Sequence, residues 1–255
     1  MSGHIRLHLE DAIARVTLSN PAKFNAMSRA MWRELRQVFT ELQQLSDVRV
    51  VVVVGEGGHF CAGGDIAEYT DFRFHPEGLR DFHENDVWGG LSALLACDLP
   101  VIAQIEGNCM GAGVEIASCC DIRLAGQGAR FGAPIAKLGF PMAPREAELV
   151  AREVGLATAR QMLLEAAVLD APTLLARGFL HTVLHDADVA AEAQQRALRI
   201  TRLAPQAARL NKQTLRALAG GQGAEALVPT AYDYADSAEH REGIAAFLAK
   251  RAPNF

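Results

Sequence analysis

The sequence predicts an α/β fold in which a spiral-like core of short strands and helices is followed by a helical C-terminal lobe. Buried strands, glycine-rich turns and helices alternate in the first half of the chain. From Arg145 onward the pattern is almost entirely helical. The sequence shows no linker, low-complexity tract or internal repeat, so we expect one continuous core.

The first predicted elements are a hairpin and an amphipathic helix. Apolar residues flank Glu10–Asp11 on both sides, from Ile5 to Leu9 and from Ile13 to Leu18, which favours two strands joined by a tight turn. Ser28 can cap the helix that follows. The apolar positions of that helix recur at intervals of three and four residues and are Met31, Leu35, Val38, Phe39, Leu42 and Leu45.

Two apolar runs, Val50 to Val54 and Val101 to Ile105, predict strands that are buried on both faces. Between them, Leu79 to Ala96 is expected to form a helix that stops before Pro100. Further short strands are predicted at Ile122 to Ala125 and at Ala129 to Phe131. Breaks in the helical tail are expected at Gly155, Gly178, Pro205 and Gly220 to Gly223.

Composition excludes several classes of function. The chain has 255 residues, is 50% hydrophobic and carries a net charge of -5, so it has no broad basic field for nucleic acid or an anionic membrane. No apolar stretch reaches the ~18 residues of a membrane span, and the first residues lack the features of a secretory signal. We therefore expect no nucleic-acid or membrane partner and a cytoplasmic location.

The five cysteines show neither a metal-binding nor a disulfide pattern. They have no CxxC spacing, and the adjacent pair Cys119–Cys120 is geometrically unsuited to a disulfide or a shared metal. We expect them to be small buried residues, and we expect no metal site.

Two glycine-rich turns follow the two predicted central strands. One contains Phe60 to Asp65, and the other runs from Gly107 to Gly113. Ligands of open α/β sheets usually bind beyond the carboxyl ends of the strands, and small residues let them approach the backbone. Such turns can also serve close packing alone, so one of them by itself would be a weak signal.

The second half of each turn predicts an oxyanion site. If helices begin at Asp65 and after Gly113, the N–H groups of Gly64 and Ala112 are left without partners at positive helix ends. Glu115 lies three residues beyond Ala112 and should project from about the same side. Because its neighbours are apolar, Glu115 is either a buried base with a raised pKa or the partner of a cation elsewhere in the chain.

Several motifs in order along the chain make it resemble the enoyl-CoA hydratase/isomerase (crotonase) superfamily. Asn20 to Met27 is similar to the N-P-x-K-x-N-A-[LM] stretch of that family, Phe60 to Asp65 to its F-C-A-G-x-D, and Ile105 to Asp121 to its V-x-G-x-x-x-G-G-G-x-E-x-x-x-x-C-D. Ala129 to Pro134 resembles A-x-F-G-x-P, and Glu242 to Arg251 resembles the E-G-x-x-A-F-x-E-K-R ending. The resemblance covers nearly the whole chain.

The resemblance implies a crotonase-like spiral of ββα repeats over residues 1–200 and a helical trimerisation lobe over residues 201–255, in a homotrimer or a dimer of trimers. It implies an acyl-CoA substrate, with coenzyme A as part of the substrate and no separate cofactor. The N–H groups of Gly64 and Ala112 would stabilise a thioester enolate, with Glu115 as general acid/base. The residues implied for binding the substrate and its coenzyme A are Lys23, Phe24, Ala62, Asp65, Ile66, Gly111, Pro134, Phe247 and Lys250, the last two often from a neighbouring subunit.

One position departs from the pattern of the family's hydratases. Those enzymes hold water between two glutamates, and the second follows the proline of the F-G-x-P motif, where this chain has Ile135. A site with Glu115 alone is poorly equipped to add water, because one group must deprotonate the water while another protonates carbon. We expect isomerase-like or lyase-like chemistry rather than efficient hydration, although familiar isomerases of the family also keep the missing glutamate.

The acyl pocket is expected to form around two variable segments. Between Tyr69 and Trp88, either His83 or Tyr69 could replace the missing acid. Near the next helix start, Arg145 and Glu146 either face water or reach the pocket. The candidate acyl-pocket residues are Tyr69, His83, Ile135, Phe140, Met142 and Glu146.

Other functions are indicated only by weaker sequence features. Gly55-Glu56-Gly57 follows a buried strand, but Phe60 stands where a dinucleotide-binding GxGxxG motif needs glycine. No serine lies in the G-x-S-x-G motif of a hydrolase. A non-catalytic family member that binds acyl-CoA is the main alternative, because one carboxylate is missing.

Overall fold

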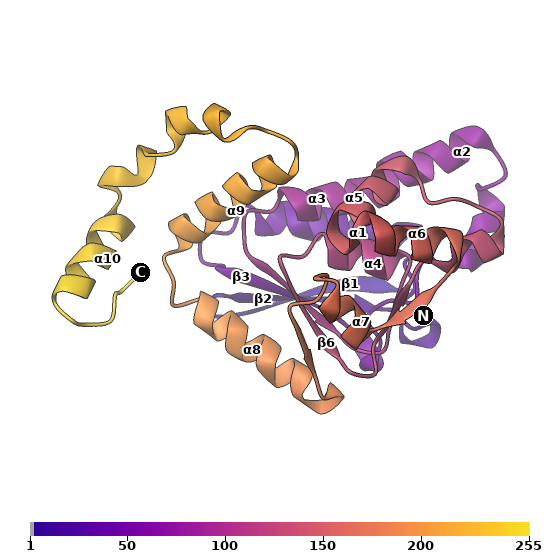
Figure 1. The fold of residues 1–255 in the computed structure, drawn as a ribbon, viewed down its shortest axis with the longest axis horizontal. Coiled ribbons are helices and arrows are strands. Elements are labelled where there is room, and N and C mark those ends of the chain that lie inside the picture. The colour runs from indigo at the N-terminus through magenta and orange to yellow at the C-terminus, as the bar shows by residue number, and fades with distance from the viewer. Residues whose placement is uncertain (1–2) are drawn as a thin grey trace.

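Two sheets form the centre of the fold in the computed structural model, which describes residues 3–255 (Figure 1). The larger sheet has six strands in the order β1 (His4–Glu10), β2 (Ile13–Ser19), β3 (Val50–Gly55), β4 (Val101–Ile105), β6 (Ile122–Gly126) and β9 (Thr182–Leu184). Its first pair is antiparallel and the remaining pairs are parallel. The smaller sheet contains β5 (Asn108–Met110), β7 (Arg130–Gly132) and β8 (Val168–Asp170).

The central strands are buried on both faces, as their apolar runs predicted. Val51 and Val53 of β3 point into the main core, whereas Val50 and Val52 point into a second cluster on the opposite face. Helix α8 (Val189–Ile200) covers the second face (Figure 1). The main core lies under α1 (Arg29–Leu42), α3 (Trp88–Ala96) and α4 (Ala112–Ser118).

The first helix confirms its predicted cap but ends earlier than expected. Ser28 accepts a hydrogen bond from the Met31 N–H at 3.2 Å, which satisfies one of the unpaired N–H groups of the first turn. The α-helix ends at Leu42, so Leu45 lies beyond it. Leu45 still packs against the core, which explains why it fits the apolar pattern of the helix.

The helix predicted over Leu79 to Ala96 starts earlier and is not a regular α-helix. It comprises α2 (Pro76–Asp81), a π-helical turn (Phe82–Val87) and α3. Proline is well tolerated in a first helical turn, which is why the segment begins at Pro76. The π-helical turn carries one extra residue per turn and cannot be recognised from the period of the apolar residues. It contains His83, a candidate pocket residue.

The prediction that the chain beyond Arg145 is almost entirely helical is wrong at two places. Helices α5 (Pro144–Val154), α6 (Leu156–Leu164) and α7 (Ala171–Ala176) are present, but β8 lies between α6 and α7, and β9 lies between α7 and α8. Each of these strands is only three residues long. So short a segment has too few residues to show an alternating pattern.

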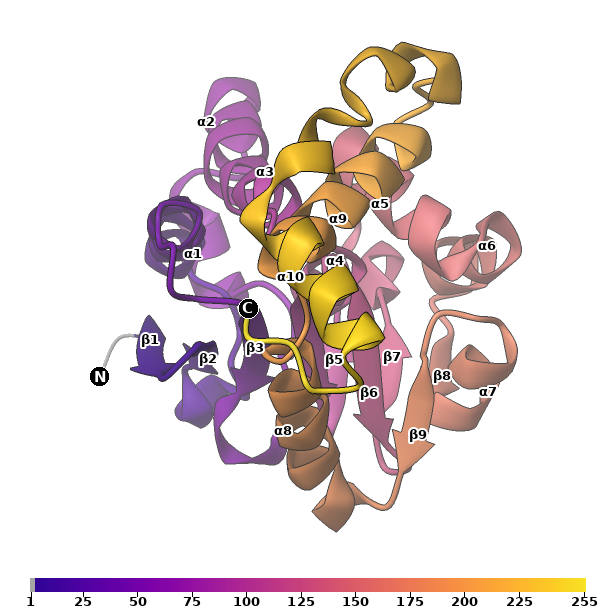
Figure 2. The same ribbon diagram turned by 90° about the vertical axis from the view of Figure 1, so that its left-hand side faces the viewer.

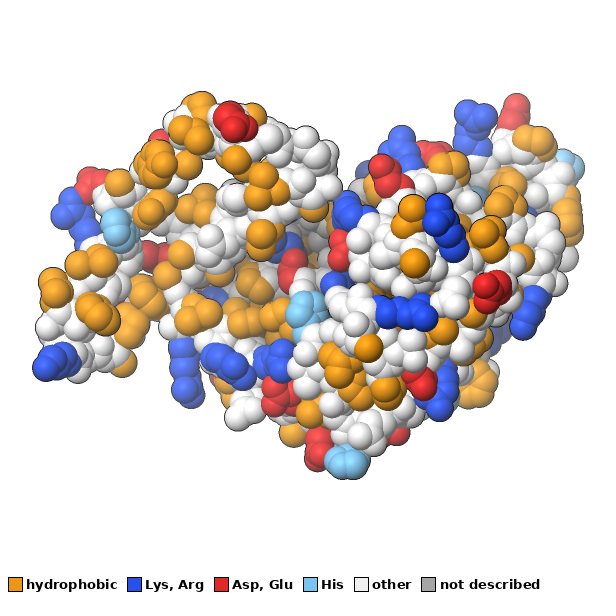
Figure 3. Space-filling model, in the orientation of Figure 1, with side chains coloured by type: hydrophobic (Ala, Val, Ile, Leu, Met, Phe, Trp, Pro, Cys, Tyr) orange, Lys and Arg blue, Asp and Glu red, His pale blue; other side chains and the backbone are white. Residues whose placement is uncertain are grey.

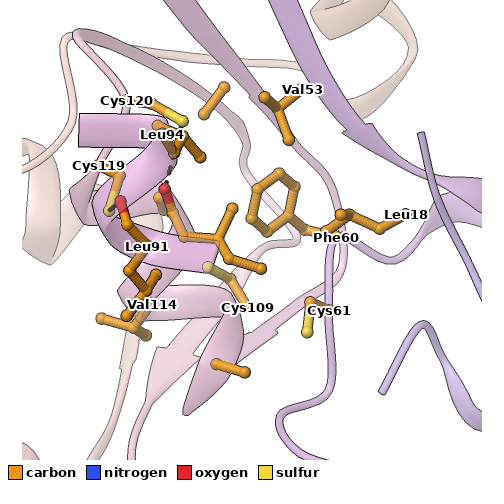
Figure 4. Packing of buried hydrophobic residues seen from close by; sticks show 14 of the residues in the cluster. Leu18, Val53, Phe60, Cys61, Leu91, Leu94, Cys109, Val114, Cys119 and Cys120 are labelled. Carbon is orange, nitrogen blue, oxygen red and sulfur yellow. Dashed lines mark hydrogen bonds between the residues drawn. The ribbon is translucent and has the colours of Figure 1, made fainter. Parts of the chain in front are cut away.

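All five cysteines are buried and free, as the sequence predicted. Cys61, Cys109, Cys119 and Cys120 line the core around Phe60 and the helices α3 and α4 (Figure 4). Burial raises the pKa of the Cys61 and Cys120 thiols to about 12, so these side chains stay protonated and act as small apolar residues.

The C-terminal lobe extends beyond the core. Helix α9 (Pro205–Ala219) docks on it through polar contacts, including Lys212 Nζ to the Leu99 carbonyl at 2.8 Å and Arg216 Nη2 to Asp98 Oδ1 at 2.8 Å. Helix α10 (Ala238–Leu248) lies farther out (Figures 1 and 2). Apolar side chains spread over this lobe (Figure 3), and those exposed to solvent are Leu203, Leu210, Leu215, Leu218, Val228, Tyr232, Tyr234, Ile244, Phe247 and Leu248. None of the helices in residues 3–255 is long and apolar enough to cross a membrane.

Candidate active site

The two glycine-rich turns lie at neighbouring strand ends and are joined by backbone hydrogen bonds. The Cys61 N–H donates to the Asn108 carbonyl, and the Met110 N–H donates to the Cys61 carbonyl, both at 2.8 Å. The approach is so close that a Cβ at Gly113 would lie 2.7 Å from the Cys61 carbonyl oxygen. Only glycine therefore allows the two turns to be held together at this point.

The N–H groups of Gly64 and Ala112 have no hydrogen-bond acceptor among residues 3–255. The backbone groups on either side of Gly64 are paired: the Gly63 carbonyl accepts from the Met27 N–H, and the Asp65 N–H donates to the Met27 carbonyl. Ala112 is the first residue of α4, at least two residues before the predicted start, and helix geometry leaves its N–H unpaired. Both residues line the same cavity, as the oxyanion prediction requires.

The cavity has a volume of about 210 Å³ and lies at the ends of β3 and β4. It contains every predicted acyl-pocket residue: Tyr69, His83, Ile135, Phe140, Met142 and Glu146. Of the residues implied for the thioester and coenzyme A, Ala62, Ile66, Gly111 and Pro134 also line it. Segments that are far apart in the sequence therefore meet at one site.

Glu115 is 7% exposed, and its carboxylate makes no hydrogen bond or ion pair with any described residue. Burial raises its pKa well above the ordinary value of 4.5, and the nearby charge of Glu146 raises it further. Of the two roles left open by the sequence, the structure thus favours a buried acid/base over the partner of a cation.

Glu146 brings a second carboxylate to the cavity. It lies in the first turn of α5, is only 4% exposed, and its Oε1 atom is 2.7 Å from Nδ1 of His83. The Nε2 atom of His83 is 3.4 Å from Nη1 of Arg73. Because an arginine N–H only donates, this chain of contacts makes Nε2 of His83 the acceptor and Nδ1 the donor to Glu146. Arg145, by contrast, pairs with Glu84 at 3.2 Å near the surface.

Tyr69 packs directly beside Gly64. A Cβ added to Gly64 would lie 2.1 Å from the Tyr69 hydroxyl, so any larger residue at position 64 would displace this side chain. Burial raises the Tyr69 pKa to about 12, with Arg73 acting in the opposite direction. Tyr69 is therefore a neutral hydrogen-bond donor in the cavity rather than a phenolate.

Arg73 is a cavity residue that the sequence analysis did not single out. The only sequence signal was its place in the variable segment, four residues after Tyr69. Its guanidinium packs against two aromatic rings, Phe140 and Tyr69. The contact with Phe140 cannot be predicted from spacing along the chain, because Phe140 comes from a different segment.

The remaining coenzyme A candidates lie outside the cavity. Lys23 Nζ pairs with Asp65 Oδ2 at 2.6 Å, and Phe24, which is 52% exposed, packs edge-on against His59. Phe247 is 82% exposed on α10, and Lys250 follows that helix. Neither of the last two lines the cavity of its own chain. Within residues 3–255, no group of three or more His, Cys, Asp or Glu side chains is arranged to hold a metal ion.

Comparison with known proteins gives one consistent result. The family profile described as enoyl-CoA hydratase/isomerase matches residues 8–255. A probable enoyl-CoA hydratase of Mycobacterium bovis is 30% identical over 254 residues, covering 98% of this chain and 97% of that protein. A 2,3-dehydroadipyl-CoA hydratase of Escherichia coli is 31% identical over 254 residues, covering 96% of each. The crystal structure of an enoyl-CoA hydratase/carnithine racemase from Magnetospirillum magneticum superposes with a TM-score of 0.94 at 37% identity, over 98% of this chain and 94% of that one.

Proposed function

Because this chain belongs to the enoyl-CoA hydratase/isomerase family, we propose that it transfers protons on an acyl-CoA thioester through an enolate held by the N–H groups of Gly64 and Ala112. The observation that carries the proposal is the presence of both unpaired N–H groups and the buried Glu115 in one cavity. An enolate places negative charge on the thioester oxygen, and fixed backbone donors stabilise it without having to reorganise.

Glu115 is the proposed general acid/base. Burial and the charge of Glu146 keep its pKa high, so the protonated form is available to deliver a proton to carbon. The same carboxylate, once ionised, can remove a proton from the neighbouring carbon. No other described carboxylate both lies beside Ala112 on α4 and lines the cavity.

The proposed reaction is isomerase-like or lyase-like rather than efficient hydration. Ile135 lines the cavity where the hydratase pattern has its second glutamate, so this wall offers no hydrogen bond to a water molecule. An apolar wall favours the transfer of a proton between two carbons by Glu115, because no water needs to be bound and activated there.

A second candidate, the addition of water, is favoured by Glu146. Its carboxylate is paired with His83 and affects the pKa of Glu115. Two carboxylates in different environments can divide the roles of acid and base. In this alternative, Glu115 delivers the proton to carbon and Glu146 accepts the proton of water.

Binding of coenzyme A is proposed to involve Lys23 and Phe24, whose side chains reach the surface beside the first turn. Phe247 and Lys250 would contribute from a neighbouring subunit of a homotrimer or a dimer of trimers. The exposed apolar surface of the C-terminal lobe supports assembly, since exposed patches of this kind usually mark interaction sites. Sedimentation at several protein concentrations tests the assembly.

The test of function is to incubate the protein with enoyl-, malonyl- and hydroxyacyl-CoA thioesters in heavy water and to follow product mass and deuterium uptake at the α and γ carbons. Uptake at both carbons without addition of water indicates isomerisation, and a mass gain of one water indicates hydration. Glu115→Gln should abolish most of the turnover, whereas Glu10→Gln, at the exposed end of β1, should not.

Two results would contradict the proposal. Unchanged turnover in Glu115→Gln would remove Glu115 from the chemistry. Binding of the thioesters without any turnover or exchange in the unmodified protein would favour the non-catalytic acyl-CoA-binding alternative.

A further inference from the structure

Arg73 is a partly buried cation in the cavity wall that has no carboxylate partner. It lines both the cavity and a wider groove of about 1210 Å³ that continues outward from it. Throughout the described chain, no Asp or Glu oxygen lies within the 4.0 Å ion-pair limit of its guanidinium. Burial lowers the Arg73 pKa, although Tyr69 and the carboxylate of Glu146, which lies beyond His83, act in the opposite direction.

The guanidinium is held so that its edge remains available. Its Cζ atom lies 3.6 Å from the centre of the Phe140 ring and 4.5 Å from that of Tyr69. Among residues 3–255, its one side-chain hydrogen-bond contact is Nη1 to His83 Nε2 at 3.4 Å. A guanidinium has five N–H donors in a planar fork, so most of them have no acceptor in this part of the chain. The two rings hold the guanidinium in place, and its unpaired N–H groups are suited to an anionic acceptor.

The surrounding groove adds positive charge beside apolar walls. Arg73, Arg80 and Arg145 line it, against the single carboxylate of Glu84, which is already paired with Arg145 at 3.2 Å. Apolar walls are contributed by Ile66, Leu79 and Leu138. An acyl chain that leaves the cavity through this groove would therefore pass apolar side chains and meet an excess of positive charge.

On the premise of the proposed function, we propose that the acyl group of the substrate ends in a carboxylate and that Arg73 binds this carboxylate through two N–H groups. The substrate class is then a coenzyme A thioester of a dicarboxylic acid. A wholly apolar acyl chain would remove more water from Arg73 and offer it no acceptor, which is costly. A carboxylate matches the guanidinium fork in shape and charge.

Calorimetric titration with saturated acyl-CoA thioesters, each with and without a terminal carboxylate, tests the proposal apart from catalysis. For the chain length that fits, the unmodified protein should bind the carboxylate form about tenfold to a hundredfold more tightly than its apolar counterpart. Arg73→Met should lose this preference while its affinity for the apolar thioester stays within about threefold of the original. Arg73→Lys should keep part of the preference, because charge remains but the fork is lost.

The matched control is Arg199→Met on α8, which covers the opposite face of the sheet and should leave the preference unchanged. Equal affinities for both members of every pair in the unmodified protein would overturn the inference. An equal loss of affinity for the carboxylate thioester and its apolar counterpart in Arg73→Met would also overturn it. The anion bound by Arg73 would then be a phosphate of coenzyme A, which both thioesters share.

Deuterium exchange at the α carbon of the same thioesters separates this inference from the proposed function. If the protein prefers the carboxylate thioester in an Arg73-dependent way but catalyses no deuterium exchange, the carboxylate site stands and the proton-transfer activity is refuted. If the protein catalyses exchange but binds both thioesters equally, only the carboxylate site is refuted. If no thioester binds, both proposals fall.

Discussion

Replacing Ala112 by proline removes one proposed oxyanion donor at little cost to the fold. The Ala112 N–H makes no hydrogen bond to another described residue, and Ala112 is the first residue of α4, where proline is best tolerated. The free energy of unfolding should therefore fall by less than about 1 kcal/mol. Loss of a comparable oxyanion donor raises the barrier by about 3 to 4 kcal/mol, so the rate of enolate formation should fall by about two to three orders of magnitude.

The assay is deuterium uptake at the α carbon of an acyl-CoA thioester in heavy water, with urea unfolding curves for each variant. Ala112→Gly is the matched control, because it keeps the N–H and should retain the rate within about tenfold. The affinity for the thioester should change little in Ala112→Gly, because this variant keeps the N–H and the space in front of it. If Ala112→Pro folds with normal stability and exchanges at the original rate, the Ala112 N–H is not an oxyanion donor.

Burial raises the pKa of Glu115 in the folded protein above the ordinary value of 4.5, so the unfolded chain loses this proton first as pH rises. The free energy of unfolding should therefore fall with rising pH between the pKa of the unfolded chain and that of the folded protein. Glu115→Gln should flatten this fall in urea titrations, and an unchanged slope would contradict the raised pKa. Gly113→Ala should destabilise the protein by about 1 to 3 kcal/mol and slow deuterium exchange at the α carbon, because its Cβ would lie 2.7 Å from the Cys61 carbonyl oxygen. The control Gly89→Ala should be tolerated, because its Cβ would come no closer than 3.5 Å to its nearest neighbour. Cys61, with a pKa raised to about 12 by burial, should resist thiol alkylation in the native state and react only after unfolding, and rapid labelling of folded protein would show that the turn opens.

Much of the candidate active site could be predicted because its central features are local. The proposed oxyanion donors lie in small-residue turns that follow two apolar runs, and Glu115 follows Ala112 by about one helical turn. The hairpin, the Ser28 cap and the central strands are local in the same way. Each requires only a few consecutive residues to show its period or its turn chemistry.

The second carboxylate of the cavity could not be located in this way. The sequence has Ile135 where the hydratase motif has a glutamate. The sequence left open whether Glu146 faces water, and the structure turns it into the cavity against His83. That contact joins α5 to a π-helical turn whose irregular geometry leaves no sequence pattern.

The sequence by itself determined the alternation of strands and helices, the two small-residue turns and the position of Glu115, because these depend on local periodicity and backbone freedom. Only the tertiary structure decided what surrounds them. Glu146, His83 and Arg73 form a chain of contacts that joins α5 to the segment between Tyr69 and Trp88, and Phe140 packs against Arg73 from another part of the chain. Which side chains share a cavity, and which charges are left without partners there, depends on long-range packing that no spacing along the chain encodes.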